Sequence, residues 1–200
     1  MRERSLRRAN WYRHVLAVNA PAALACWLTS GGSLTARLKA HAGAFRVQVL
    51  RQRPAQCLAD ESAALGLHRM GNVRSRCWER EVLLRCDNTP VVFAHTVVPM
   101  SADAADWPLF SALGERSLGT TLFGDPMVDR GPLEYARLRG SHPLARRARA
   151  ALAAQGIAVP DELLLYARRC LYRRRQGTLL VTEVFLPQVA ALVPKTSNSR

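Results

Sequence analysis

The chain has 200 residues and a formal net charge of +14, from 29 Lys and Arg residues against 15 Asp and Glu residues. A hydrophobic fraction of 48% excludes a disordered chain, the length is enough for one domain with a sizeable core, and no apolar run reaches the roughly 18–20 residues of a membrane-spanning helix. The basic excess has two open explanations: attraction to nucleic acid, an anionic membrane or a small anion, or a GC-rich coding sequence that raises Arg and Ala together.

Residues 1–21 are expected to form a basic N-terminal tail. Five arginines among residues 1–13, followed by an apolar stretch that ends at Cys26, resemble a signal peptide. Asn19 and Pro21 interrupt the apolar stretch, so export is not expected and the protein is placed in the cytoplasm.

The first half of the chain predicts two helices and one strand. A short helix is expected over 21–28, with Pro21 near its first turn, and Ser33 is a good N-cap for a helix over 34–42. The alternation of apolar and polar residues over 45–51 predicts a strand. Residues 52–71 carry mixed signals and are expected to form a connection with a short helix.

The second half predicts two hairpins. The first joins strands at 77–85 and 91–98 through a turn at 87–90, and the second joins 165–175 to 178–186 around Gln176-Gly177.

Helices are expected between and around these hairpins. Residues 109–123 are expected to hold a short helix, a break at Gly114 and a second helix starting near Ser117, and residues 141–158 an arginine-rich surface helix ending at Gly156. Residues 188–200 form a polar C-terminal tail. Helices beside hairpin-joined strands indicate an α+β fold with an antiparallel sheet.

The cysteines and histidines suggest neither a disulfide framework nor a metal site. The cysteine count is odd, there is no C-x-x-C pair, and no two histidines lie at ligand spacing. Free thiols in a reducing compartment and no bound metal are therefore expected. The residues concerned are Cys26, Cys57, Cys77, Cys86, Cys170, His14, His41, His68, His95 and His142.

Two predicted strands each place one charged residue on an otherwise apolar face. Arg80 shares its face with Trp78, Val82 and Leu84, and Glu183 shares its face with Leu179, Val181 and Phe185. If both faces line one cavity, it suits a small, mostly apolar acid, because Arg binds a carboxylate through two hydrogen bonds and Glu can act as acid or base. Two alternatives remain: a structural Arg80–Glu183 salt bridge, or a solvent-exposed face around Glu183.

Seven short blocks in order resemble the bacterial chorismate pyruvate-lyase family. They are WL at 27–28, GGSLTARL at 31–38, EREVLL at 79–84, TVVP at 96–99, LGERSLGTTLF at 113–123, ARR at 167–169 and LLVTEVFLP at 179–187. No single block is diagnostic, and the resemblance rests on their order. It covers a chorismate lyase-like domain at about residues 22–187.

The resemblance implies a fold and an activity. Members of that family have a six-stranded antiparallel sheet with helices packed on it and an internal ligand cavity closed by flaps. They convert chorismate to 4-hydroxybenzoate and pyruvate, the first committed step of ubiquinone synthesis, and need no cofactor.

The resemblance also implies the site residues. The family's ligand-binding arginine and inward glutamate fall on Arg80 and Glu183, which we expect to be the catalytic pair, and pocket contacts fall on Leu34 and Leu118, each near a helix start. Ordinary core packing is the alternative for both leucines. The arginine pair 168–169 matches paired arginines of the family. They could help to bind a second carboxylate, but a solvated basic strand end is the favoured interpretation.

Other functions and partners are weighed against this resemblance. The same fold resembles effector-sensing domains of bacterial transcription regulators, so a non-catalytic module that binds a small aromatic acid is the alternative. No aromatic-rich basic platform is evident, so no specific nucleic acid is expected. The segments 51–70, 139–164 and 188–200 look longer than in the family and leave open a weak association with anionic membranes. A monomer is expected.

Overall fold

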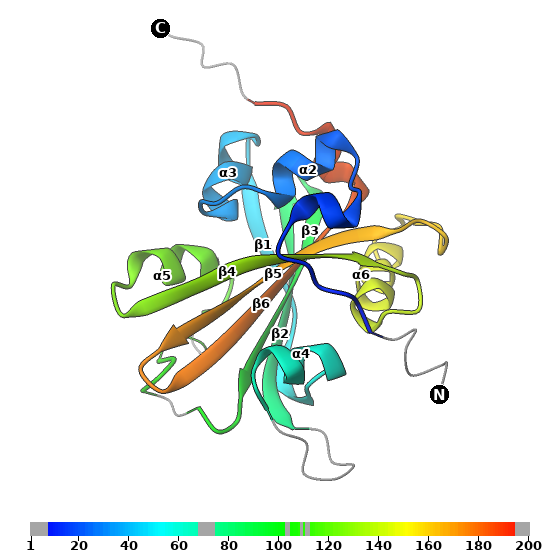
Figure 1. Cartoon of the computed structure of the whole chain (residues 1–200). Helices are drawn as coiled ribbons and strands as arrows, with labels where there is room; N and C mark the ends of the chain where they lie inside the picture. Colours follow the sequence, from blue (N-terminus) through cyan, green and yellow to red (C-terminus); the bar gives the residue numbers. More distant parts are fainter. Residues whose placement is uncertain (1–7, 68–74, 103–104, 109, 111–112, 195–200) are drawn as a thin grey trace, which may run out of the picture.

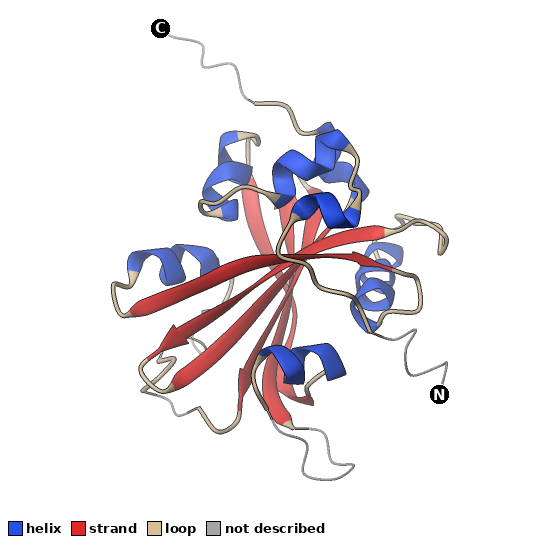
Figure 2. Ribbon diagram, viewed as in Figure 1, coloured by secondary structure: helices blue, strands red, loops and turns tan. Residues whose placement is uncertain are grey.

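The computed structural model describes residues 8–67, 75–102, 105–108, 110 and 113–194. Its centre is one twisted antiparallel sheet of six strands in the order β1-β2-β3-β6-β5-β4 (Figures 1 and 2). The strands are β1 Phe45–Gln56, β2 Arg76–Cys86, β3 Thr89–Pro99, β4 Val128–Leu138, β5 Leu165–Arg174 and β6 Gly177–Phe185. The predicted α+β class with an antiparallel sheet is confirmed.

Seven short helical segments flank this sheet within the described residues. They are η1 Val15–Val18, α2 Ala22–Leu28, α3 Leu34–Ala40, α4 Ala59–Ala64, α5 Leu118–Gly124, α6 Pro143–Ala153 and η2 Pro187–Ala191. None combines the length and the hydropathy that crossing a bilayer requires.

The helices divide between the two faces of the sheet. On one face, α2, α3 and α5 pack over residues that include Val82, Thr96, Cys170, Val181 and Glu183; we call it the cavity face. On the other, α6 and the segment around α4 pack over residues that include Leu83, His95, Leu180 and Thr182; we call it the opposite face. Both faces of the central strands are therefore buried, unlike the half-solvated sheet that a simple α+β pattern suggests.

Both predicted hairpins are present, with turns of two residues. Asp87 and Asn88 have φ values of 48° and 66°, as the central residues of a type I′ turn require, so Thr89 and Pro90 belong to β3 rather than to the turn. The second turn lies at Arg175-Gln176, one residue before the expected position, because Arg174 pairs with Gly177.

The two edge strands depart most from expectation. β1 continues to Gln56, so residues 52–56 are strand rather than connection, and α4 supplies the expected short helix. β4 was not expected from the residues at all. Each edge strand carries a proline, Pro54 or Pro132, and a break in register, features that edge strands tolerate and that hide the two-residue period.

Three predicted helices are confirmed with their starts. Ser33 caps α3 by accepting a hydrogen bond from the backbone N of Ala36, α2 follows Pro21, and α5 follows Ser117. The other helix expected within 109–123 falls largely on residues outside the described part, and so does His68.

The segments assigned to tails contact the domain where they are described. Tyr12 forms a β-bridge with Tyr135, and Val18 is 2% exposed in the core beside α2 and α3. Near the C-terminus, Val189 of η2 is fully buried in the same cluster. Residues 1–7 and 195–200 lie outside the described part.

Candidate active site

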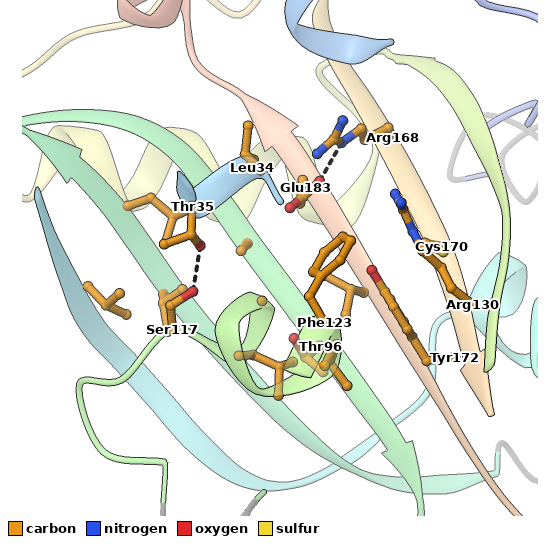
Figure 3. A pocket seen from close by; sticks show the side chains of 18 of the residues that line it. Leu34, Thr35, Thr96, Ser117, Phe123, Arg130, Arg168, Cys170, Tyr172 and Glu183 are labelled. Carbon is orange, nitrogen blue, oxygen red and sulfur yellow. Dashed lines mark hydrogen bonds and ion pairs between the residues drawn. The ribbon is translucent and has the colours of Figure 1, made fainter. Parts of the chain in front are cut away.

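A cavity lies between the cavity face of the sheet and the segments that cover it: the loop before α3, α3 itself and α5 (Figure 3). The space free of protein atoms, counted together with the open solvent at its mouth, is about 660 Å³. All four predicted site residues, Leu34, Arg80, Leu118 and Glu183, line this one cavity.

Arg80 comes from the middle of β2 and is 2% exposed. Its Nη2 donates to the backbone oxygens of Gly114, at 2.6 Å, and Arg116, at 3.4 Å. Its Nε is buried and finds no hydrogen-bond acceptor among the described residues. Burial lowers the pKa of Arg80, and none of the described carboxylates pairs with it. The guanidinium therefore has donor capacity left for an anionic ligand.

Glu183 pairs with Arg168 and not with Arg80. Arg168 Nε lies 2.5 Å from Glu183 Oε2, and the two residues are directly opposite each other on β5 and β6 (Figure 3). The Glu183 side chain is 19% exposed, toward the cavity that it lines. The structure therefore supports neither the Arg80–Glu183 salt bridge nor the solvent-exposed face weighed from the sequence.

The expectation that Arg168 and Arg169 form a solvated strand end is wrong. Arg168 is 2% exposed, and its Nη1 donates to the backbone oxygens of Trp27, Leu28 and Ser30, which close the end of α2 onto the sheet. Arg169 points to the opposite face, is 8% exposed and donates to Glu134 Oε2 at 2.8 Å. Both are buried because helices or their flanking segments cover both faces of the sheet.

Leu34 and Leu118 begin the two helices that cover the cavity. Leu34 is the first residue of α3 and is 4% exposed, and Leu118 is the first residue of α5 and is half-buried. A hydrogen bond of 2.5 Å between the hydroxyls of Thr35 and Ser117 joins these two helix starts (Figure 3). The two segments are thus tied together over the cavity.

Several cavity residues were not foreseen from the sequence. Arg130 lines the cavity from β4, and its Cζ lies 5.0 Å from the ring centre of Phe123 in α5. Cys170 and Tyr172 line it from β5. Arg130 was missed because β4 was missed. The register of β5 against β6 was the signal that could have placed Arg168 beside Glu183.

The charges of the cavity sum to a positive site. Burial raises the pKa of Tyr172 and of Cys170, so both side chains are neutral at pH 7. The charged lining residues are three arginines and one glutamate, and three positive charges less one negative leave +2. A mostly apolar cavity with this charge suits a small organic dianion.

The opposite face holds a second group of buried charges that the sequence did not reveal. His95 lies 2.9 Å from Glu61 and 3.2 Å from Glu81, and Arg147 of α6 reaches both Glu81, at 2.7 Å, and Glu79, at 3.0 Å. Glu79, Glu81 and His95 lie close enough together to resemble a metal-ligand set. Arginines already neutralise both carboxylates, which disfavours a cation there.

Solved structures with the same fold include bacterial transcription regulators. A GntR-family regulator from Bacillus cereus is 11% identical with a TM-score of 0.51, and the match covers 78% of this chain and 99% of that one. PhnF from Mycobacterium smegmatis is 14% identical with a TM-score of 0.52, over 86% of this chain and 71% of that one. At these identities the likeness concerns the fold alone.

Relatives in sequence are much closer. The protein is 48% identical over 169 residues to a probable chorismate pyruvate-lyase of Ralstonia nicotianae, covering 84% of this chain and 83% of that protein. A protein of the same name from Aromatoleum aromaticum is 44% identical over 182 residues, 91% of this chain and 94% of that protein. The family model for chorismate lyase matches residues 5–193. The chain therefore belongs to the chorismate lyase family.

Proposed function

We propose that this protein is a chorismate pyruvate-lyase that converts chorismate to 4-hydroxybenzoate and pyruvate. The observation that carries the proposal is a cavity with a net charge of +2, in which Arg80 keeps free donors and Glu183 is held by Arg168. Chorismate is a small ring with two carboxylates, so its charge matches that of the site. Family membership and the names of the relatives support the same activity.

The reaction needs positioning more than strong chemistry. A proton leaves ring C4, the bond between C3 and the ether oxygen breaks, and the ring becomes aromatic. The departing enolpyruvate takes up a proton and becomes pyruvate. Aromatisation drives the reaction, so the protein has to bind the dianion, exclude water and select a conformer that eliminates. The buried cavity under α3 and α5 meets these requirements.

Arg80 and Glu183 are assigned different roles. The free donors of Arg80 bind a carboxylate, which fixes the ring in the cavity. Glu183, paired with Arg168, is an acceptor, and a carboxylate has room for further hydrogen bonds. We therefore assign it to the 4-hydroxyl and the C4 proton rather than to protonation of the leaving oxygen. Leu34 and Leu118 contact the ring from the covering helices.

A product assay tests the proposal. The purified protein is incubated with chorismate, and 4-hydroxybenzoate and pyruvate are quantified by chromatography. Saturable formation of both products in equal amounts, above the rate without protein, is expected. Absence of turnover despite tight binding of 4-hydroxybenzoate would instead support the alternative, a non-catalytic aromatic acid sensor of the same fold.

Ubiquinone synthesis in the cytoplasm is the proposed setting. All five cysteines are free thiols and four of them are buried, which fits a reducing compartment. We propose a monomer without cofactor or metal, and light scattering on the eluted protein checks the mass. The division into a tail at 1–21, a domain at 22–187 and a tail at 188–200 stays a prediction, and the buried Val18 and Val189 count against free tails.

Weak association with anionic membranes is a further part of the proposal. In the 139–164 extension, Arg139 and Arg146 are exposed, whereas Arg147 and Arg149 bind groups inside the protein. Fewer arginines than the net charge suggests are thus free for a surface or a nucleic acid. Co-sedimentation with vesicles tests this, and equal binding to neutral and anionic vesicles would contradict it.

A further inference from the structure

Three arginines line the cavity, and they differ in how many of their donors are already used. Arg168 is committed, because Nε pairs with Glu183 and Nη1 with three backbone oxygens. Arg80 and Arg130 each keep a buried Nε that finds no hydrogen-bond acceptor among the described residues. Two arginines are thus open to anions, and the substrate proposed above carries two carboxylates.

Arg80 and Arg130 stand on opposite walls of the cavity. Arg80 belongs to β2 and Arg130 to β4, and strands β3, β6 and β5 lie between them. Four strand spacings separate their backbones by about 19 Å along the sheet, and two extended side chains that reach inward leave room for one small molecule between them. Because they enter the cavity from strands on its two sides, the two arginines are placed to meet different groups of one ligand.

Arg130 is held in place without being neutralised. Its Nη1 donates to the backbone oxygen of Gly31, and its guanidinium stacks over Phe123 at 5.0 Å. Cys170 and Tyr172 beside it are neutral, because burial raises the pKa of both. None of the described carboxylates pairs with Arg130. A preformed, uncompensated guanidinium facing an apolar cavity is suited to a carboxylate.

The order of the strands indicates which carboxylate goes to which arginine. Between Arg80 on β2 and Glu183 on β6 lies β3, whose cavity residues Ala94 and Thr96 are small and leave room for a ring. A ring with its carboxylate on Arg80 and its 4-hydroxyl on Glu183 lies across β3. C3 is next to C4, so the enolpyruvyl group starts near Glu183 and extends toward β5 and β4, where Arg130 stands.

We infer that Arg130 binds the enolpyruvyl carboxylate and so distinguishes the substrate from the aromatic product. This inference rests on the function proposed above. The product 4-hydroxybenzoate retains the ring carboxylate and the hydroxyl but has lost the group that Arg130 binds. Arg80 and Glu183 contact both substrate and product, whereas Arg130 contacts only the substrate and the departing pyruvate.

Steady-state kinetics and product binding on matched variants test the assignment. Arg130→Gln is expected to raise KM for chorismate about 10–100-fold, the loss of one charge-assisted pair, while the Kd for 4-hydroxybenzoate stays within about twofold. Arg80→Gln is expected to raise both constants. Arg130→Lys, which keeps the charge without the fork, is expected to fall between Arg130→Gln and the wild type in KM.

The outcomes separate this inference from the proposed function. Suppose that the wild type turns over chorismate. The assignment of Arg130 is then wrong if Arg130→Gln raises KM and the product Kd by the same factor, and also if it raises neither constant. If the wild type gives no product, the lyase function itself is rejected. A general loss of structure would raise both constants in Arg130→Gln and in Arg130→Lys alike, and would also count against the assignment.

Discussion

The two faces of the sheet both bury arginines and carboxylates, yet they use them differently. On the opposite face, Glu79 and Glu81 are matched by Arg51, Arg53 and Arg147 within ion-pair distance. On the cavity face, Arg80 and Arg130 find no carboxylate partner in the described part of the chain and keep unused donors. Burial of a charge is common to both faces. Buried guanidinium nitrogens without an acceptor also occur on the opposite face, at Arg85 and Arg149. Among the described residues, those of Arg80 and Arg130 are the ones that line the cavity.

This difference between the two faces indicates which charges stabilise the fold and which are available to bind a ligand. A buried charge without a partner destabilises the folded protein by several kcal/mol. Such a charge is therefore most often retained because it binds a ligand or takes part in catalysis. A fully matched group needs no such explanation. Glu183 is intermediate, since Arg168 pairs with it while its side chain remains open to the cavity.

Arg168→Met removes an arginine of the cavity lining that is paired with a carboxylate, as the arginines of the opposite face are, and we expect the largest effect there. It leaves Glu183 without its partner and three backbone oxygens at the end of α2 without their donor. Loss of a buried pair of this kind costs about 3–5 kcal/mol in the free energy of unfolding. Chemical denaturation measures it, and turnover is expected to fall as well.

Arg168→Lys is the control for that substitution. Lys keeps the charge but cannot donate to Glu183 and to the backbone oxygens at the same time, so an intermediate loss in the free energy of unfolding is expected. Unchanged stability in Arg168→Met would contradict the account of the α2 end.

The charge group around His95 predicts how stability changes with pH. Burial by itself would lower the pKa of His95, but Glu61 and Glu81 on its two ring nitrogens offset this and raise the pKa from 6.5 to about 9. The folded state therefore holds a proton that the unfolded state releases. This contribution, about 3 kcal/mol, is complete below about pH 6.5 and disappears as the pH rises through 9.

Melting temperatures of the wild type and of His95→Gln, measured between about pH 6 and pH 10, check this, because that range spans the unfolded and folded pKa values of His95. The difference between the two proteins should shrink as the pH rises. A difference that stays constant over this range would show that His95 does not titrate with its carboxylates.

Asp60 predicts the behaviour at low pH. Burial raises its pKa, but His142 and Trp11 more than offset this and lower the pKa to about 2. Its contribution is therefore complete above about pH 3.8 and is lost as the pH falls through 2. Asp60→Asn is expected to flatten the acid limb of the stability curve, and an unchanged limb would contradict the Asp60–His142 pair.

The hydroxyl pair over the cavity gives the smallest expected effect. Thr35→Val removes the bond to Ser117 that joins α3 to α5, worth about 1 kcal/mol. A fall of about 1 kcal/mol in the free energy of unfolding and up to about a fivefold rise in KM are expected. Ser117→Ala should match it, and the double variant should add nothing further. Additive effects would mean that the two helices are not coupled through this bond.

The central strands were predictable because their residues alternate strictly between two buried faces. This alternation alone predicts that Arg80 and Glu183 lie on apolar faces of their strands, and both line the cavity. The edge strands were not predictable in the same way. In β4, Gly131-Pro132 and a break in register remove the two-residue period, and Arg130 was missed with the strand.

The partner of Glu183 was missed through a shift of one residue in a turn. A turn at Gln176-Gly177 pairs Glu183 with Cys170, whereas the turn at Arg175-Gln176 pairs it with Arg168. Arg175 adopts a positive φ of 53°, which arginine rarely does. The sequence pattern therefore favoured a turn that includes Gly177. Pairings between helices and strands, such as Arg147 with Glu79 and Glu81, depend on packing that no local pattern encodes.

The comparison of the two faces is tested most directly by Glu183→Gln beside Glu81→Gln, with turnover of chorismate and the free energy of unfolding measured on both. We expect Glu183→Gln to lower kcat about 10²–10⁴-fold. Its cost in stability is expected to be smaller than that of Glu81→Gln, because the amide oxygen can still accept from Arg168 Nε and Arg168 keeps its three backbone acceptors. Glu81→Gln is expected to cost about 3 kcal/mol of stability and to leave kcat of the folded protein within about twofold. Equal losses of kcat in both variants, or normal turnover in Glu183→Gln, would contradict the claim that the cavity-face carboxylate serves the reaction and the opposite-face carboxylate serves the fold.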